Sequence, residues 1–316
     1  MRIIAFLIFI SLLSCRPPSQ TRKIDLAANS IVEIQRPNGK GDFQSHGTGF
    51  LIERRNAPHG YAFVISNEHV LLLTAVEVVI KANSAFLDQT SIQPNDSFNL
   101  GGYVWRLDEG VFRCTVRLEA GLTYLSHDSL DIAVLPIRIP SEFLNNNQGR
   151  RTLLRMSDAE PISQNMIVYR KDVQLGELVY FLGFPNGIGT LEGQLYSTSE
   201  GLVPANSYTE NAPNPVARFG AVAWIAKDSK RFLVDALSYS GNSGSPVFYA
   251  KSSKHTKLEL IGLVFGHEGD TTSVIREHGK RPRLIHSGNM GLLKAHFADD
   301  ILNLVREAEK LPLDAQ

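Results

Sequence analysis

Short apolar runs separated by turn residues dominate the chain from Ser30 onward, and this pattern limits the possible folds more than any other feature. The runs are rich in β-branched and aromatic residues, and several end at Asn, Pro or Gly, as in antiparallel sandwiches and barrels. The sequence therefore predicts an all-β fold. The expected strands are Ile31–Ile34, Gly49–Ile52, Tyr61–Ile65, Tyr103–Leu107, Phe112–Leu118, Ile132–Ile137, Leu178–Leu182, Val216–Trp224, Arg231–Val234, Pro246–Tyr249 and Leu258–Phe265.

Three segments depart from this pattern. Residues 145–151 are polar and contain Gly, so they are the best candidate for a linker between two halves of similar size. Residues 73–80 are apolar enough for either a strand or a short helix. Between Leu292 and Val305, apolar residues recur at helical spacing, which predicts a C-terminal amphipathic helix packed on the second half. A membrane-surface helix is the weaker alternative because the polar face is not rich in Lys or Arg.

The charge balance and the histidine spacing exclude several functional classes. The 316 residues contain 32 basic and 32 acidic side chains, which argues against a nucleic-acid partner. No run reaches the roughly 18 apolar residues of a membrane-spanning helix. The nine histidines show no paired metal-ligand spacing, and no glycine loop precedes a helix in a phosphate-binding pattern. The sequence therefore predicts neither a metal site nor a cofactor.

The N-terminus has the layout of an export signal. An arginine follows the initial Met, residues 3–13 are almost entirely apolar, and Ser14 precedes Cys15. Residues 12–15 (Leu-Leu-Ser-Cys) resemble a bacterial lipobox, although the residue at position 13 is usually smaller. We therefore expect a lipoprotein signal peptide over residues 1–14, lipidation of Cys15, and a tether over residues 15–27. The protein is then an exported envelope lipoprotein, facing the periplasm or in the outer membrane, whose lipid is its only membrane contact.

The second of the two cysteines, Cys114, has no partner for an intramolecular disulfide if Cys15 carries lipid. It lies within an apolar run, so we interpret it as a buried small hydrophobe rather than a nucleophile. The folded domain must then be held together by its core, without disulfides.

The strongest chemical motif is Gly241-Asn242-Ser243-Gly244-Ser245-Pro246. Glycines on both sides of a serine permit a tight turn with unusual backbone dihedral angles. Such a turn exposes the serine hydroxyl and lets successive backbone N–H groups converge into an oxyanion hole. The alternative interpretation is a plain Gly-Ser-Pro turn.

Two further motifs supply the partners that a nucleophilic serine requires. His69 follows the strand-like run that ends near Ile65, where a histidine can act as a general base. Asp131 precedes an apolar strand, and its carboxylate needs a partner near the core, for which a histidine N–H is suitable. Taken alone, Asp131 is better explained as a turn or helix-cap residue.

The order His69, Asp131, Ser243 resembles that of trypsin-like serine peptidases. Four further segments resemble that family: Gly47–Ile52 its early glycine-rich strand, residues 183–187 (Gly-Phe-Pro-Asn-Gly) a turn of the second barrel, Val234–Ala236 the approach to the nucleophile, and Ile261–Gly266 the substrate-lining strand. The matching segments run from about Ser30 to about Leu293. The nucleophile loop is most similar to the HtrA/Deg-like and glutamyl-endopeptidase-like branches.

This resemblance implies two six-stranded antiparallel β-barrels followed by a C-terminal α-helix. The peptidase domain would span residues 28–312, with barrels at about 28–144 and 152–290 and the helix at about 291–310. The resemblance also implies an acyl-enzyme mechanism on a protein or peptide substrate. Ser243 would be the nucleophile, His69 the base and Asp131 its orienting acid, and the N–H groups of Gly241 and Ser243 would form the oxyanion hole.

The family's pattern also suggests where substrate specificity would lie. It implies that Leu237 is at the floor of the specificity pocket and that Val264, Phe265 and Gly266 line the substrate. An apolar floor suits a small or medium apolar residue. Asn242 stands where zymogen-activated relatives have Asp, so activation through an ion pair with a new N-terminus is not expected. No room remains after the catalytic barrels for the peptide-binding domain of HtrA-type proteins.

Two functions from different classes therefore remain. The first is an active, lipid-anchored serine endopeptidase. The second is a catalytically silent surface protein that binds peptides on the same fold. All three triad candidates are present, which favours the endopeptidase. The sequence does not predict an oligomeric state.

Overall fold

The structure is a computed structural model of the 316-residue chain. It describes residues 24, 27–37, 43–55, 61–71, 75–81, 97–100, 102–108, 111–117, 124–140, 161–185, 195–198, 201–204, 215–228, 230–237, 239–250, 258–275 and 283–311. Cys15, the expected signal peptide and the expected linker lie outside these residues.

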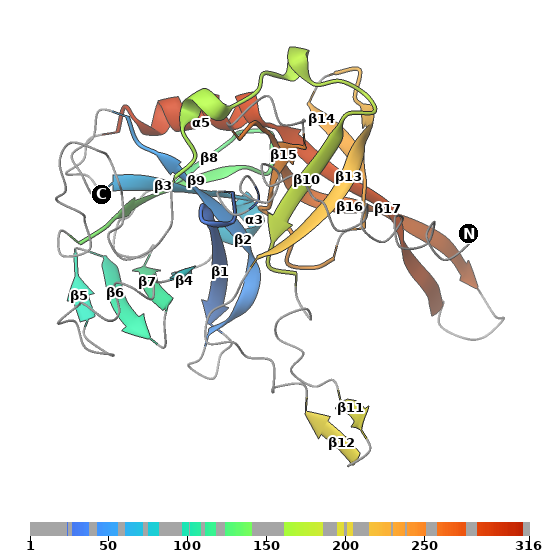
Figure 1. Ribbon diagram of the computed structural model, residues 1–316, viewed down its shortest axis with the longest axis horizontal. Helices are drawn as coiled ribbons and strands as arrows, with labels where there is room; N and C mark the ends of the chain where they lie inside the picture. Colours follow the sequence, from blue (N-terminus) through green and yellow to red (C-terminus); the bar gives the residue numbers. More distant parts are fainter. Residues whose placement is uncertain are drawn as a thin grey trace, which may run out of the picture.

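The first half forms one antiparallel nine-stranded sheet (Figure 1). Strands predicted at Ile31–Ile34, Tyr61–Ile65 and Tyr103–Leu107 are present and slightly longer than expected. The sheet order is β5 (Ser97–Asn99), β6 (Tyr103–Asp108), β7 (Val111–Arg117), β4 (Ala75–Lys81), β1 (Ile31–Pro37), β2 (Phe43–Glu53), β3 (Tyr61–Ser66), β9 (Ala133–Arg138) and β8 (Leu125–Ser126). The ambiguous run at residues 73–80 thus contributes a strand, β4.

Side chains join the two ends of this sheet around a common core. The Tyr103 hydroxyl on β6 donates to the Pro136 carbonyl on β9 at 2.9 Å, and the Trp105 indole donates to the Arg138 carbonyl at 2.8 Å. Tyr103 and Trp105 are almost fully buried, together with Cys114 on β7. The sheet therefore curls around its apolar face, and side-chain hydrogen bonds bridge its two halves.

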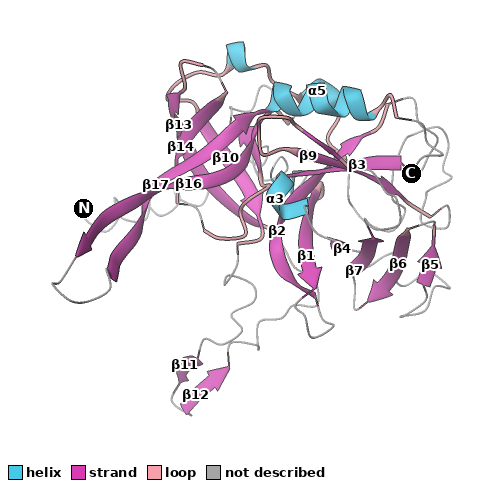
Figure 2. Ribbon diagram, turned by 180° about the vertical axis from the view of Figure 1, so that it is seen from behind, coloured by secondary structure: helices cyan, strands magenta, loops and turns pink. Residues whose placement is uncertain are grey.

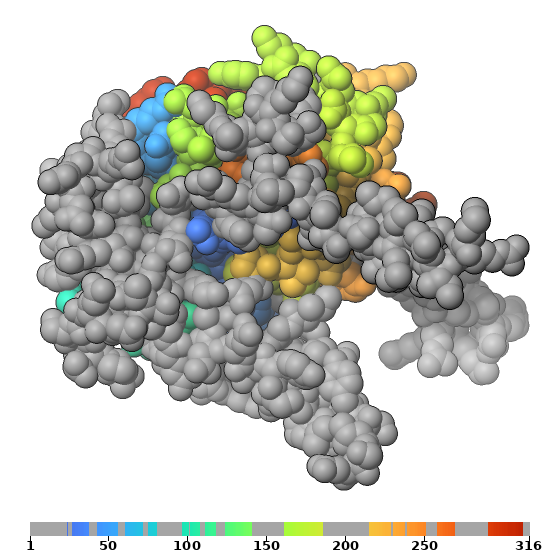
Figure 3. Space-filling model, in the orientation of Figure 1, coloured from blue at the N-terminus to red at the C-terminus, as the bar shows by residue number. Residues whose placement is uncertain are grey.

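The second half is a closed six-stranded barrel. Its order is β10 (Leu178–Gly183), β13 (Val216–Ile225), β14 (Arg231–Asp235), β17 (Arg283–Phe297), β16 (Leu260–Ile275) and β15 (Pro246–Tyr249). The β16–β17 hairpin extends well beyond the barrel, and a separate hairpin of β11 (Leu195–Thr198) and β12 (Gly201–Pro204) stands apart (Figure 1). Figure 3 shows residues of β10 and β13 side by side at the surface.

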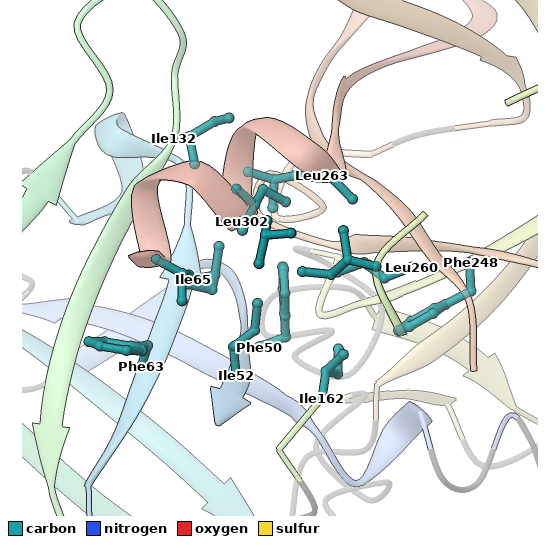
Figure 4. Close-up of a cluster of buried hydrophobic side chains, with 14 of the residues drawn as sticks. Phe50, Ile52, Phe63, Ile65, Ile132, Ile162, Phe248, Leu260, Leu263 and Leu302 are labelled. Atoms are coloured by element: carbon teal, nitrogen blue, oxygen red, sulfur yellow. The ribbon is translucent and has the colours of Figure 1, made fainter. Parts of the chain in front are cut away.

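The C-terminal helix α5 (Ala298–Ala308) covers the junction of the two halves. Its buried residues, among them Ile301 and Leu302, pack against Phe50 and Ile65 from the first half and Leu263 from the second (Figure 4). Asp299 and Asp300 lie in the first helical turn, where carboxylates are favoured by the helix dipole. Both form ion pairs with Arg170 in the 3₁₀ turn η4 (Arg170–Asp172), which ties this loop to the helix.

The all-β double-barrel prediction and the C-terminal helix are confirmed, with three corrections of detail. The first sheet has nine strands rather than six. The helix begins at Ala298, because residues 292–296 pair with β14, residues 293–297 pair with β16, and both sets continue β17. The helix also packs on both halves rather than on the second alone. Within the described part of the chain, no helix is both long and apolar enough to cross a membrane.

Candidate active site

The three predicted catalytic side chains come from three short connecting segments: a single helical turn, a bend and a tight turn. His69 lies in the single-turn helix α3 (Glu68–Leu71), which directly follows β3 (Figure 2). Asp131 lies in a bend just before β9. Because β3 and β9 are antiparallel partners and Ser66 pairs with Ala133 at their ends, the two loops necessarily emerge side by side.

His69 and Asp131 form a paired unit. His69 Nδ1 lies 2.6 Å from Asp131 Oδ2, and the His69 backbone N–H donates to Oδ1 at 3.1 Å. The buried Asn67 side chain donates to the Asp131 carbonyl at 2.6 Å, and the Asn67 carbonyl accepts from the N–H groups of Val70 and Leu71. Asn67 therefore joins the histidine turn to the aspartate bend.

The electrostatics of the pair favour an ionised aspartate. Burial by itself raises the pKa of the Asp131 carboxyl, but hydrogen bonds from the His69 ring and backbone outweigh burial, so the pKa lies below its ordinary value. An ionised carboxylate accepts hydrogen bonds only, so His69 Nδ1 must carry the proton and Nε2 is left as the basic nitrogen. The His69 side chain is 50% exposed, so a substrate can reach its ring.

The predicted nucleophile lies on a tight turn with two glycines at positive φ. Gly241 has φ of 93° and Gly244 φ of 88°, values that an L side chain rarely adopts. A Cβ on Gly244 would lie 1.8 Å from the Thr48 carbonyl oxygen and 2.3 Å from Ser66 Oγ. The turn can therefore approach β2 and β3 this closely only because residue 244 is glycine. Ser243, between the two glycines, is half-buried.

Thr48 on β2 connects the first half to this turn. Its backbone N–H donates to the Ser243 carbonyl at 2.9 Å, and its hydroxyl donates to the Gly241 carbonyl at 2.8 Å. A Cβ on the preceding residue, Gly47, would lie 2.8 Å from the Val70 side chain and 3.3 Å from the Ser243 carbonyl oxygen. Residues 47 and 48 thus pack between the serine turn and the helix that carries His69.

The backbone donors of the turn divide into two sets. The N–H of Asn242 donates to the Tyr239 carbonyl, that of Gly244 to Val264, and that of Ser245 to Asn242. Among hydrogen bonds between described residues, none uses the N–H of Gly241 or Ser243. These are the two donors that the sequence analysis expects for an oxyanion hole.

The expected substrate-binding residues occupy different environments. The Val264 side chain is fully buried inside the second barrel, which corrects the expectation that it lines the substrate. Its backbone N–H donates to the Ser245 carbonyl and its carbonyl accepts from the Gly244 N–H, so Val264 supports the serine turn instead. Phe265 is half-buried, and a Cβ on Gly266 would meet no atom within 4 Å, which leaves open space beside the strand. Leu237 is 57% exposed, so its side chain does not form a buried pocket floor.

Sequence reasoning missed two histidines near the catalytic pair. His46 precedes Gly47; burial lowers its pKa, and positive charge on Arg36 and His69 adds to this shift. His296 on β17 is 5% exposed and stacks on Phe265, with ring centroids 4.0 Å apart. Burial lowers the pKa of His296 to about 4. Of these two histidines, only His46 has a signal in the sequence that could have placed it near the site: it directly precedes the Gly47–Ile52 motif.

Among the described residues, no group of three or more His, Cys, Asp or Glu side chains is arranged to hold a metal ion. Cys114 is completely buried with a free thiol, and burial raises its pKa well above the ordinary value. Both properties make it a poor nucleophile, since the thiolate is the reactive form.

A family model described as a trypsin-like peptidase domain matches residues 47–254. No curated protein matches this chain. Among solved structures, a mutant of the tobacco etch virus protease is similar at 13% identity, over 92% of this chain and 82% of that one, with a TM-score of 0.43. The thermostable serine protease AL20 from an extremophilic microorganism matches at 9% identity, over 91% and 100%, with a TM-score of 0.43. A Glu endopeptidase in complex with MPD matches at 12% identity, over 90% and 92%, with a TM-score of 0.41.

Proposed function

This chain belongs to the trypsin-like peptidase family, and on that premise we propose that it is a serine endopeptidase. Ser243 is its nucleophile, His69 the general base and Asp131 the residue that orients the base. The observation that carries the proposal is the two-point contact between His69 and Asp131, made by the ring at 2.6 Å and by the backbone at 3.1 Å. A capping or turn aspartate has no need of the ring contact.

The proposed reaction proceeds through an acyl-enzyme. Ser243 Oγ attacks the substrate carbonyl carbon while its proton passes to His69 Nε2, and the N–H groups of Gly241 and Ser243 hold the resulting oxyanion. The protonated His69 then gives the proton to the leaving amine as the peptide bond breaks. Water attacks the acyl-enzyme by the same steps, with His69 again acting as base. Asp131 keeps the imidazole in the required tautomer and stabilises its charged form.

Labelling with a fluorophosphonate serine-hydrolase probe, followed by mass mapping, tests this proposal. We expect a single adduct on Ser243, lost in the His69→Ala variant and retained in Ser240→Ala, which changes an exposed serine of the same turn. Casein or peptide cleavage should disappear in Ser243→Ala. A well-folded protein that gives no adduct contradicts the proposal and favours the alternative, a catalytically silent protein that binds peptides on the same fold.

We also propose that the protein is exported and held to the bacterial envelope by lipid on Cys15. The support is the sequence of residues 1–15 alone. In detergent-phase partitioning, the lipidated protein should enter the detergent phase, and Cys15→Ser should move it to the aqueous phase. A wild-type protein that stays aqueous, with an unmodified Cys15 in its mass spectrum, contradicts this part.

A further inference from the structure

Thr48, a fully buried residue of β2, contacts the serine turn through two separate hydrogen bonds. Its hydroxyl donates to the Gly241 carbonyl at 2.8 Å, and its backbone N–H donates to the Ser243 carbonyl at 2.9 Å. Gly241 and Ser243 are also the residues whose N–H groups form the proposed oxyanion hole. One residue of the first half therefore holds both residues of the second half that carry the proposed donors.

The hydroxyl bond fixes the peptide unit that follows Gly241. Thr48 holds the carbonyl of this unit, and its N–H, which belongs to Asn242, donates to the Tyr239 carbonyl at 3.1 Å. Gly241 has φ of 93° and no Cβ, so its own backbone restricts the orientation of the unit only weakly. The Thr48 hydroxyl therefore supplies a constraint that the glycine does not.

The backbone bond of Thr48 does the same for the peptide unit that follows Ser243. The carbonyl of this unit accepts from the Thr48 N–H, and its N–H, which belongs to Gly244, donates to the Val264 carbonyl at 2.8 Å. The peptide unit between these two anchored units carries the Ser243 N–H. The direction of that donor is therefore set on both sides by units that Thr48 holds.

Thr48 is itself held in place from both halves of the molecule. Its hydroxyl accepts from the Phe184 N–H, which follows β10, at 2.9 Å. Its carbonyl accepts from the Ser66 hydroxyl, at the end of β3, at 2.6 Å. Ser66 is fully buried and lies three residues before His69. Thr48 thus connects the strand that leads to His69 with the turn that carries Ser243.

We propose that Thr48 is a positioning residue for the oxyanion hole, whose hydroxyl keeps the Gly241 and Ser243 N–H groups aligned on the transition state. This inference rests on the proposed endopeptidase function and extends it to a residue outside the triad. Removing an oxyanion donor costs about 10²- to 10³-fold in kcat, and misplacing a reacting group by about 1 Å costs about 10²-fold. Loss of the hydroxyl leaves both donors present but less constrained, so we expect kcat to fall about 10- to 100-fold.

The test compares Thr48→Val, which keeps the shape of the side chain without its hydroxyl, with Thr48→Ser, which keeps the hydroxyl. On a fluorogenic casein-derived peptide, the full-length Thr48→Val protein should show the lower kcat with KM within about twofold of wild type, because the donors act on the transition state. Thr48→Ser should retain most of the wild-type kcat. The acidic midpoint of the pH profile should not move, because both bonds of the hydroxyl go to backbone groups rather than to His69. The control Thr115→Val removes a hydroxyl that donates to Glu77 at 3.1 Å and should leave kcat unaltered.

Hydrogen–deuterium exchange of residues 239–245 gives a readout that does not depend on activity. Exchange at the Asn242 N–H should be faster in Thr48→Val than in wild type and normal in Thr48→Ser. An unchanged kcat in folded Thr48→Val, a loss that Thr48→Ser does not restore, or a loss confined to KM overturns the role of Thr48. Thr48→Ala also lacks the hydroxyl and gives the same test where Thr48→Val does not fold. Absence of a fluorophosphonate adduct on wild-type Ser243 overturns the endopeptidase function instead, and exchange still tests the hold of Thr48 on the turn.

Discussion

Replacing His296 with phenylalanine should make the protein less sensitive to acid. The His296 ring is 5% exposed and stacks on Phe265. Burial lowers its pKa from 6.5 to about 4; the Lys230 backbone and the Asp131 carboxylate oppose this shift, while the charges of His127 and Arg231 add to it. The native state therefore holds this imidazole neutral over a pH range in which the unfolded chain protonates it.

The sign and size of the effect follow from proton linkage. Between pH 6.5 and about 4 the unfolded state binds the additional proton, so the free energy of unfolding falls as the pH is lowered through this window. A pKa difference of two to three units corresponds to about 3 kcal/mol at the acidic end. Wild-type protein should therefore lose about 3 kcal/mol more stability than His296→Phe between pH 7 and pH 4.

Urea unfolding followed by tryptophan fluorescence, at several pH values across this window, measures the difference directly. Phenylalanine preserves the aromatic stack on Phe265 and removes the titrating group. His267→Phe changes an exposed histidine on the neighbouring strand and should leave the pH dependence as in the wild type. Parallel stability curves for the wild type and His296→Phe would refute the assignment of a buried neutral imidazole.

Three further perturbations test the site and its support. Asp131→Asn should lower kcat by about 10⁴ with little change in the melting temperature, because an amide selects the wrong His69 tautomer. Gly244→Ala should destabilise the protein by about 3 kcal/mol or more and abolish probe labelling, since its Cβ would meet the Thr48 carbonyl at 1.8 Å. Glu77→Ala should cost about 3 kcal/mol of unfolding free energy, because the fully buried carboxylate accepts from Arg106 and Arg113.

Controls make each of these results specific. Asp128→Asn changes an exposed carboxylate in the same bend and should leave kcat unaltered. A Gly176→Ala variant places a Cβ in open space at positive φ, so it reports the dihedral strain without the clash. Glu68→Ala removes a half-buried carboxylate outside the Glu77 cluster and should cost much less than Glu77→Ala. Equal effects of a variant and its control would contradict the structural reasoning.

The sequence by itself determined the fold class. It also singled out His69, Asp131 and Ser243 as the candidate catalytic residues. Alternating apolar runs bounded by turn residues predict strands because each run must bury one face locally. The glycines around Ser243 predicted a tight turn without help from the rest of the chain, since tight turns at positive φ require residues without a Cβ. The roles proposed for His69 and Asp131 came from their order along the chain and from the resemblance to a family. Their proximity follows from the β3–β9 pairing.

Tertiary structure alone decided the features that depend on register and on contacts distant in sequence. The start of α5 was misplaced because Leu293 and Phe297 satisfy helical spacing, yet ladders with β14 and β16 hold them in β17. The burial of His296 could not be predicted from the sequence, because it is created by strands and loops far away along the chain. Thr48 reaches Gly241 only because the two halves of the molecule pack together. Local spacing encodes which face a residue presents, whereas the neighbours across that face are set by strand pairing over the whole chain.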